Sequence, residues 1–293
     1  MSCRELVGTG AAVVTPLHRG EVDHDALRKI VDHLIDGGLD YLMALGTTGE
    51  TPALSIDEQH AVLQTILSQT AGRVPVWSGH SAGNNTAACI AAISNSQDLH
   101  LEGHMLSAPA YNKPNQEGIT AHFGAIAQST DLPILLYNNP GRSVVNISAS
   151  TMAHLAGKHK NIIGVKEATA NLSHMSQIIH ETPDHFIVIS GDDPTAVASI
   201  AVGAQGCLSV LANALPRLFS EMIKSALDGD FARAQEIHYQ LWPLHSPLYV
   251  DGNPAGVKCL MKAQGLLQEE LRLPLTPVSD ETRRLLQSLH KAL

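Results

Sequence analysis

The sequence predicts an α/β fold, a (β/α)₈ TIM barrel followed by a small C-terminal helical domain. Short apolar stretches of strand length alternate with amphipathic helical stretches, and eight such pairs fill residues 1–229. Eight repeats of this length suit a closed barrel, which typically takes about 250 residues. The alternative is an open doubly wound sheet, which is disfavoured because no Gly-x-Gly-x-x-Gly motif follows any predicted strand.

Each predicted strand is a run of apolar and small residues, as expected for a parallel strand that is buried on both faces. The eight runs are Val7–Thr15, Asp40–Leu45, Val74–Ser78, Gly103–Ser107, Pro133–Tyr137, Asn161–Val165, Phe186–Ser190 and Gly206–Val210.

Helical stretches separate and follow these strands. Asp25–Gly38 has apolar residues at helical spacing and stops at a Gly-Gly pair, whereas the second helix opens with the capping box Ser55–Glu58. The remaining six are Asn84–Ser94, Gln116–Gln128, Ser148–Ala156, Asn171–His180, Pro194–Val202 and Pro216–Leu227.

The alternation ends at Gly229-Asp230. Residues 230–293 contain three helical stretches and no evident strand. We therefore expect a barrel domain over residues 1–229 and a helical domain over residues 230–293. The three stretches are Phe231–Trp242, Ala255–Gln264 and Asp280–Leu293.

Composition excludes several classes of protein. A net charge of −9 argues against a surface for nucleic acid or for anionic membranes, and no apolar run is long enough to span a bilayer. The apolar run after Arg4 is too short for a signal peptide, and the four cysteines form no Cys-x-x-Cys pair. These features predict a cytoplasmic protein with reduced thiols.

Lys166 is the first candidate for chemistry. It directly follows the apolar strand Asn161–Val165, so its amine should lie at the rim of an apolar core. A desolvated amine can attack a ketone and form a Schiff base. The alternative is a lysine that extends from the strand end into solvent and has no chemical role.

Other polar residues follow the ends of neighbouring predicted strands. In a barrel of this type the active site lies at the carboxyl ends of the strands. Thr47 and Thr48, Tyr111, Tyr137 and Gly191 should therefore share one face with Lys166. A tyrosine one strand away from the lysine would be within range for proton transfer.

Five motifs at successive strand ends carry a family resemblance. They are Gly46–Glu50 (GTTGE), Tyr111–Pro114 (YNKP), Tyr137–Arg142 (YNNPGR), Gly164–Ala168 (GVKEA) and Ser190–Asp193 (SGDD). On these motifs the chain, from about Val7 to its C-terminus, resembles the dihydrodipicolinate synthase and N-acetylneuraminate lyase family of class I, Schiff-base aldolases.

The resemblance implies catalytic roles for four residues. Lys166 would form the imine with the ketone of pyruvate, and Tyr137 would act as general acid and base. Thr47 and Tyr111 would complete a hydroxyl relay, with Tyr111 reaching in from a neighbouring subunit of a homotetramer built from two dimers. The imine is covalent, so no cofactor and no metal are implied.

The resemblance also implies four substrate contacts. Thr48, Gly191 and the backbone near Leu208 would hold pyruvate, and Arg142 would bind the carboxylate of the second substrate bidentately. An arginine there favours aspartate semialdehyde, and hence lysine and diaminopimelate biosynthesis. The alternatives are another pyruvate-dependent aldolase acting on a sugar acid or hydroxy-oxoglutarate, and a barrel that binds an oxo-acid as a sensor without turnover.

The chain departs from the family pattern at several positions. Ala110 stands where a second tyrosine is frequent, and Asn139 stands where an aliphatic residue is usual. The positions that match a lysine-binding pocket of two histidines and a glutamate are Ile56, Gln59 and Ala88. Inhibition by lysine is therefore expected to be weak or absent.

Other ligands are disfavoured. We expect the 16 histidines to be surface or core residues and not metal ligands, and Gly46–Glu50 lacks the Gly-Lys-Ser/Thr of a phosphate loop. Asp192 and Asp193 follow a strand and a glycine, so we expect them to cap the next helix and not to hold a metal pair.

Overall fold

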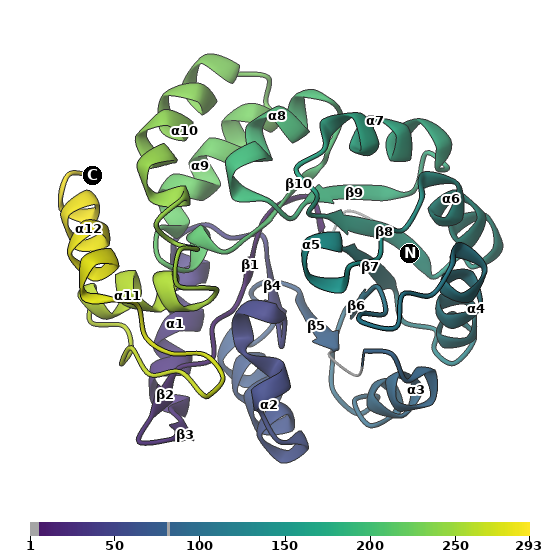
Figure 1. The fold of residues 1–293 in the computed structure, drawn as a ribbon, viewed down its shortest axis with the longest axis horizontal. Coiled ribbons are helices and arrows are strands. Elements are labelled where there is room, and N and C mark those ends of the chain that lie inside the picture. Colours follow the sequence, from purple (N-terminus) through teal and green to yellow (C-terminus); the bar gives the residue numbers. More distant parts are fainter. Residues whose placement is uncertain (1–5, 81–82) are drawn as a thin grey trace.

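The computed structural model describes residues 6–80 and 83–293, and eight parallel strands in this part of the chain close into a barrel (Figure 1). The predicted fold class is confirmed. The strand β1 closes the barrel because it pairs with β4 on one side and β10 on the other. The strands are β1 (Gly8–Ala12), β4 (Tyr41–Ala44), β5 (Val76–His80), β6 (Gly103–Ser107), β7 (Ile134–Asn138), β8 (Ile162–Glu167), β9 (Ile187–Ser190) and β10 (Gly206–Ser209).

Helices surround the barrel and connect its strands (Figure 1). Six of them begin at an Asn, Asp or Ser whose side chain accepts a hydrogen bond from the first helical turn. The capping box predicted at Ser55 and Glu58 is confirmed. The helices are α1 (His24–Asp36), α2 (Ile56–Thr70), α3 (Thr86–Ser94), α4 (Gln116–Ala127), α6 (Ala149–Lys158), α7 (Leu172–Glu181), α8 (Ala196–Ala201) and α9 (Pro216–Leu227).

Large apolar side chains fill the interior of the barrel. They include Tyr41, Met43 and Trp77, which are fully buried together with Leu135, Ile189 and Leu208. Two glycines make room for the rings, because a Cβ at Gly10 would collide with Tyr41 and a Cβ at Gly103 would collide with Trp77. Packed side chains therefore fill the barrel interior, and we expect the chemistry at the ends of the strands.

Three further helices follow the barrel, as the sequence predicts: α10 (Phe231–His245), α11 (Ala255–Ala263) and α12 (Asp280–Lys291). The helix α10 lies against α9 and α8, and α12 lies against α11 and α10 (Figure 1). The helix α10 continues beyond the predicted end at Trp242, through Pro243, because Leu244 and His245 extend its buried face.

A short hairpin and a single helical turn were not predicted. A hairpin of β2 (Leu17–His18) and β3 (Glu21–Val22) follows β1, and one helical turn, α5 (Pro140–Ser143), follows β7. The hairpin turns at Arg19 and Gly20, which both have positive φ, and two-residue strands are too short to give an alternating pattern. Among the described residues, no helix is both long and apolar enough to cross a membrane.

Candidate active site

Lys166 lies within strand β8, which corrects the expectation that the strand ends before it. The observed strand includes Lys166 and Glu167, because both continue the ladder to β7 and β9. Only 5% of Lys166 is exposed. The amine is therefore desolvated inside the barrel and does not extend from a strand end into solvent.

Tyr137 on β7 is the neighbour of Lys166 in the barrel. The two residues are register partners, and the Lys166 Nζ lies 4.5 Å from the centroid of the Tyr137 ring. Tyr137 is 7% exposed, and its Oη accepts a hydrogen bond of 3.0 Å from the Asn139 Nδ2. The predicted proximity of a phenol to the lysine is confirmed.

The surroundings of Tyr137 make the phenol easier to ionise than an ordinary tyrosine. Burial raises the pKa of the Tyr137 phenol, but the charge of Lys166, the Asn139 hydrogen bond, the charge of Arg142 and the Thr47 hydroxyl together outweigh it. The net result is a pKa below the ordinary value for tyrosine. A phenol shifted in this direction is a better proton carrier near neutral pH.

Gly191 borders the stem of Lys166. A Cβ at this position would lie 2.6 Å from the Lys166 Cε and 2.8 Å from the Ala168 Cβ. The Gly191 N–H also donates to the Glu167 carbonyl oxygen, at 2.7 Å. A glycine is thus required here, because any side chain would displace the lysine or separate β8 from the segment after β9.

Thr47 and Thr48 form a tight 3₁₀ turn after β4, and residues from the C-terminal part hold this turn. The Thr48 Oγ1 accepts a hydrogen bond of 3.1 Å from the Asn253 Nδ2. Glu50, two residues on, is buried against the Lys258 ammonium and also accepts the Arg272 N–H at 3.1 Å. Contacts with residues more than 200 positions away therefore fix this turn, and the local sequence does not predict them.

Asp192 and Asp193 have different hydrogen-bond partners. Asp192 caps the next turn, as expected, by accepting hydrogen bonds from the N–H and Oγ1 of Thr195. The expectation is wrong for Asp193, which is buried and accepts the N–H groups of Val210 and Leu211. Burial raises the pKa of the Asp193 carboxyl to about 6, although these hydrogen bonds oppose the change.

Asp193 therefore ties the end of β9 to the segment that follows Leu208 on β10. Leu208 itself is fully buried in the barrel interior, in the same cluster as Tyr137. Leu208 and Tyr137 therefore both belong to the apolar interior of the barrel.

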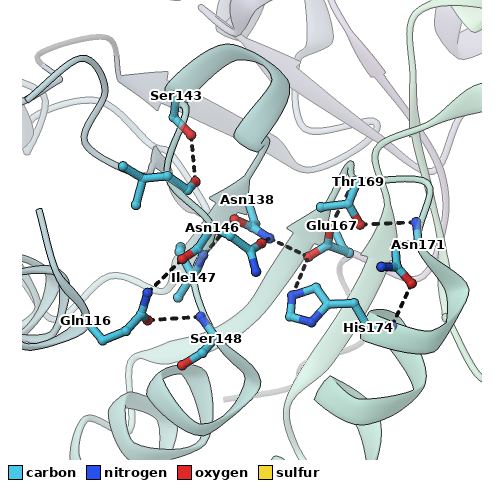
Figure 2. A network of polar contacts seen from close by, with 11 residues as sticks. Gln116, Asn138, Ser143, Asn146, Ile147, Ser148, Glu167, Thr169, Asn171 and His174 are labelled. Carbon is cyan, nitrogen blue, oxygen red and sulfur yellow. Dashed lines mark hydrogen bonds and ion pairs between the residues drawn. The ribbon is translucent and has the colours of Figure 1, made fainter. Parts of the chain in front are cut away.

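Arg142 lies on the single turn α5 and is exposed. A loop over residues 139–146 carries α5. The last residue of β7, Asn138, is fully buried, and its side chain accepts the N–H of Ile147 just after this loop (Figure 2). The sequence related Arg142 to Tyr137 only because both lie in the Tyr137–Arg142 motif. The structure shows that they also interact electrostatically, because the charge of Arg142 contributes to the lowered pKa of Tyr137.

Tyr111 is not brought into the site by its own chain. It is 91% exposed, and its backbone has a positive φ of 68°. The preceding Ala110 is fixed by two hydrogen bonds to the Asn84 side chain. The phenol is therefore presented on the surface by a strained and tethered turn.

The three positions expected at a lysine pocket carry no carboxylate. Ile56 is 77% exposed at the start of α2, and Ala88 is exposed on α3. The Gln59 amide donates to the carbonyl oxygens of Thr51 and Leu54.

No group of three or more His, Cys, Asp or Glu residues in the described ranges could hold a metal ion. Cys89, Cys207 and Cys259 are buried free thiols, and burial raises the pKa of each. Cys3 and Arg4 lie outside the described residues.

Comparison with known proteins identifies the chain. A buried lysine beside a tyrosine at one end of a (β/α)₈ barrel is the arrangement of a class I aldolase, and the chain is a lyase of this class. Residues 5–293 match the Dihydrodipicolinate synthetase family, and the chain belongs to this family.

Its relatives match over nearly their full length. A 4-hydroxy-tetrahydrodipicolinate synthase of Phocaeicola vulgatus is 46% identical over 273 residues, which cover 93% of this chain and 92% of the relative. The crystal structure of dihydrodipicolinate synthase from Aquifex aeolicus is 38% identical, with a TM-score of 0.94 and 98% of each chain covered. A monomeric dihydrodipicolinate synthase variant has a TM-score of 0.95 at 34% identity, with 99% of this chain and 97% of that chain covered.

Proposed function

We propose that this protein is a 4-hydroxy-tetrahydrodipicolinate synthase, which condenses pyruvate with L-aspartate 4-semialdehyde in lysine and diaminopimelate biosynthesis. The observation that carries the proposal is the buried Lys166 amine, 4.5 Å from the Tyr137 ring. The names of the relatives agree with it.

Lys166 is the nucleophile. Its amine attacks the ketone of pyruvate, and loss of water gives an imine. Removal of a proton from the pyruvyl methyl group gives an enamine, whose carbon attacks the aldehyde of the second substrate. Tyr137 carries protons in these steps, and its lowered pKa suits the task.

Pyruvate is held on the side of the barrel that faces β4, β9 and β10. Thr48 binds its carboxylate, helped by the backbone near Leu208, and Gly191 leaves space beside the lysine stem. Thr47 relays protons to Tyr137, in keeping with its hydroxyl's effect on the pKa of that phenol.

Arg142 selects the second substrate. Its guanidinium is exposed on α5 yet close enough to Tyr137 to lower the pKa of the phenol. A carboxylate bound there in bidentate fashion would place an aldehyde toward the enamine. The same barrel without such an anchor would suit the second candidate, an aldolase for a sugar acid or 4-hydroxy-2-oxoglutarate.

Tyr111 requires a second subunit. A phenol that is 91% exposed on a tethered turn can join the relay only across an interface, so the working unit is at least a dimer and, by family resemblance, a tetramer of two dimers. Because Ile56, Gln59 and Ala88 offer no anion to an ammonium group, lysine inhibits weakly or not at all.

A coupled assay separates the two candidates. The protein is incubated with pyruvate and either L-aspartate 4-semialdehyde or a sugar-derived aldehyde, and the products are identified by mass spectrometry. The proposal expects turnover to the cyclic dicarboxylate with the semialdehyde. Faster turnover with the sugar-derived aldehyde would favour the second candidate.

A further inference from the structure

A buried polar network lies behind the proposed active site, on the outer side of strands β7 and β8 (Figure 2). Its centre is Asn138, which is fully buried. The Asn138 Nδ2 donates to the Asn146 Oδ1 at 2.7 Å and to the Glu167 Oε2 at 2.8 Å. The Asn138 Oδ1 accepts the Ile147 N–H at 3.0 Å.

The network fixes the loop that carries Arg142. Asn138 precedes this loop, and its amide binds the loop's far end at Asn146 and Ile147. Gln116 on α4 reinforces that end, donating to the Asn146 carbonyl oxygen at 2.8 Å and accepting the Ser148 N–H at 3.0 Å. The side chain at the start of the loop thus holds the loop's far end.

Inside the loop, the Ser143 Oγ lies within hydrogen-bond distance of the carbonyl oxygens of Asn139, at 3.0 Å, and Val145, at 2.9 Å. The turn that presents Arg142 is therefore internally braced as well as closed at its base.

The other arm of the network begins next to the lysine. Glu167 is buried, and because successive residues of a strand point to opposite sides, it faces away from the barrel interior while Lys166 faces into it. The Glu167 Oε1 accepts the Thr169 N–H at 2.8 Å, and the His174 Nε2 lies 3.7 Å from the Glu167 Oε2. A carboxylate removed from water needs such partners.

We propose that Asn138 and Glu167 are positioning residues that fix the Arg142 loop relative to Lys166 and thereby set recognition of the second substrate. The inference rests on the proposed function, in which the aldehyde substrate binds Arg142 while pyruvate binds Lys166. Neither side chain touches substrate. Their effect passes through the loop, so it falls on the second substrate and spares imine formation.

Asn138→Ala tests the proposal. It releases Asn146 and Ile147, and a loop that shifts by about 1 Å can cost up to about 10²-fold. We expect kcat/KM for the semialdehyde to fall by about 10- to 100-fold, while pyruvate still forms the borohydride-trappable imine with unchanged concentration dependence. Equal losses for both substrates would overturn the proposal.

A double-mutant cycle with Arg142→Ala asks whether the loss passes through the arginine. In the Arg142→Ala background, adding Asn138→Ala should cause little further loss for the semialdehyde. Independent, multiplying losses would show that Asn138 does not act through Arg142.

Exchanging the amide of Asn138 and the carboxylate of Glu167 tests whether their hydrogen bond can be restored. Asn138→Asp places a second carboxylate against Glu167 and should impair recognition of the semialdehyde. Adding Glu167→Gln restores a donor opposite an acceptor, and the introduced carboxylate still accepts the Ile147 N–H. The exposed Asn146 amide, which accepts from Asn138 in the unmodified protein, can rotate so that its NH₂ group donates to this carboxylate. We expect the double variant to regain most of the lost activity. Failure to regain it in a folded double variant would overturn the proposal.

Asn161→Ala is the matched control. Asn161 precedes β8 at the opposite end of the barrel, and its side chain also makes two hydrogen bonds, to the carbonyl oxygens of Ala127 and Thr130. This variant should lose stability without separating the two substrates. If the unmodified protein forms no imine with pyruvate, the proposed function fails, whereas a normal imine with no substrate-specific loss in Asn138→Ala contradicts only the positioning role.

Discussion

At the scale of single residues, the site depends on a few polar groups held in an apolar interior. Lys166 and Tyr137 are both buried, and their neighbours in the barrel include Ile189 and Leu208. Electrostatic interactions are stronger there than in water, so one charge or one hydrogen bond has a large effect on its neighbour. The lowered pKa of Tyr137 is an example.

Tyr137→Phe removes only the phenolic group and should leave the fold intact. We expect kcat to fall by about 10²- to 10⁴-fold, the range for a positioned acid–base group, with little change in imine formation. Steady-state kinetics alongside borohydride trapping measure the two effects separately. Activity within a few-fold of the unmodified protein would assign the proton transfer to water or to another group.

Asn139→Leu removes the N–H donor that binds the Tyr137 Oη. The hydrogen bond favours the phenolate, so its loss raises the pKa of Tyr137 and moves the corresponding limb of the pH–activity profile to higher pH. Asn139→Asp, which places an anion there, should move the limb further in the same direction. A limb that stays in place for both variants would mean that Tyr137 does not govern it.

At the scale of elements, side chains alternate along β7 and β8, so the proposed catalytic groups and the groups that position them lie on opposite sides of the strands. Tyr137 and Lys166 point into the barrel, and the next residue of each strand, Asn138 and Glu167, lies on the outer side in a polar network (Figure 2). One pair of strands therefore carries both the proposed catalytic groups and the base of the loop that presents Arg142.

Arg142→Ala should raise KM for the semialdehyde far more than KM for pyruvate, because separate groups hold the two carboxylates. Loss of a charge-assisted hydrogen bond costs about 1.5–3 kcal/mol, or roughly 10- to 150-fold in affinity. Initial rates with each substrate varied in turn provide the comparison. Similar increases for both substrates would show that Arg142 holds the whole site together.

The sequence predicted the elements well where a pattern spans several residues. All eight barrel strands and the helices after the barrel were located, and Pro216–Leu227 was predicted to the residue. The β2–β3 hairpin and α5 were missed because two to four residues are too few to show a period. The predicted strand ended before Lys166 because a charged residue after an apolar run normally indicates the end of a buried strand.

The same limit applies to the site. The proximity of Lys166 and Tyr137 could be predicted from the strand pattern, whereas the role of Thr48 stays a prediction. Asn253 and Lys258, which hold the Thr47–Thr48 turn, come from more than 200 residues away and carry no local signal. Asp193 likewise accepts the N–H of Leu211, which lies in the turn after the next strand, β10.

At the scale of the whole molecule, the C-terminal part holds the Thr47–Thr48 turn from outside the barrel. Lys258 on α11 is fully buried, and its ammonium pairs with Glu50 and donates to the Glu270 carbonyl oxygen. Glu270 in turn accepts the N–H groups of Arg19 and Gly20 at the tip of the hairpin. The segment between α11 and α12 thus links the hairpin to the turn that carries Thr48.

Lys258→Met should leave the buried Glu50 carboxylate without its ammonium partner, keeping only the Arg272 N–H, and lower the free energy of unfolding by about 3–5 kcal/mol. Adding Glu50→Gln removes that charge, so the double variant should be more stable than Lys258→Met alone. Urea unfolding compares the three proteins. A double variant less stable than Lys258→Met would show that the charge on Glu50 is not what destabilises the single variant.

Imine formation between Lys166 and pyruvate can be measured by mass spectrometry of the whole protein and its peptides after borohydride reduction in the presence of pyruvate. We predict one reduced pyruvyl group per chain, located on Lys166, and none in the Lys166→Ala variant. An adduct on a different lysine, or turnover of the unmodified protein with no adduct, would show that Lys166 is not the nucleophile.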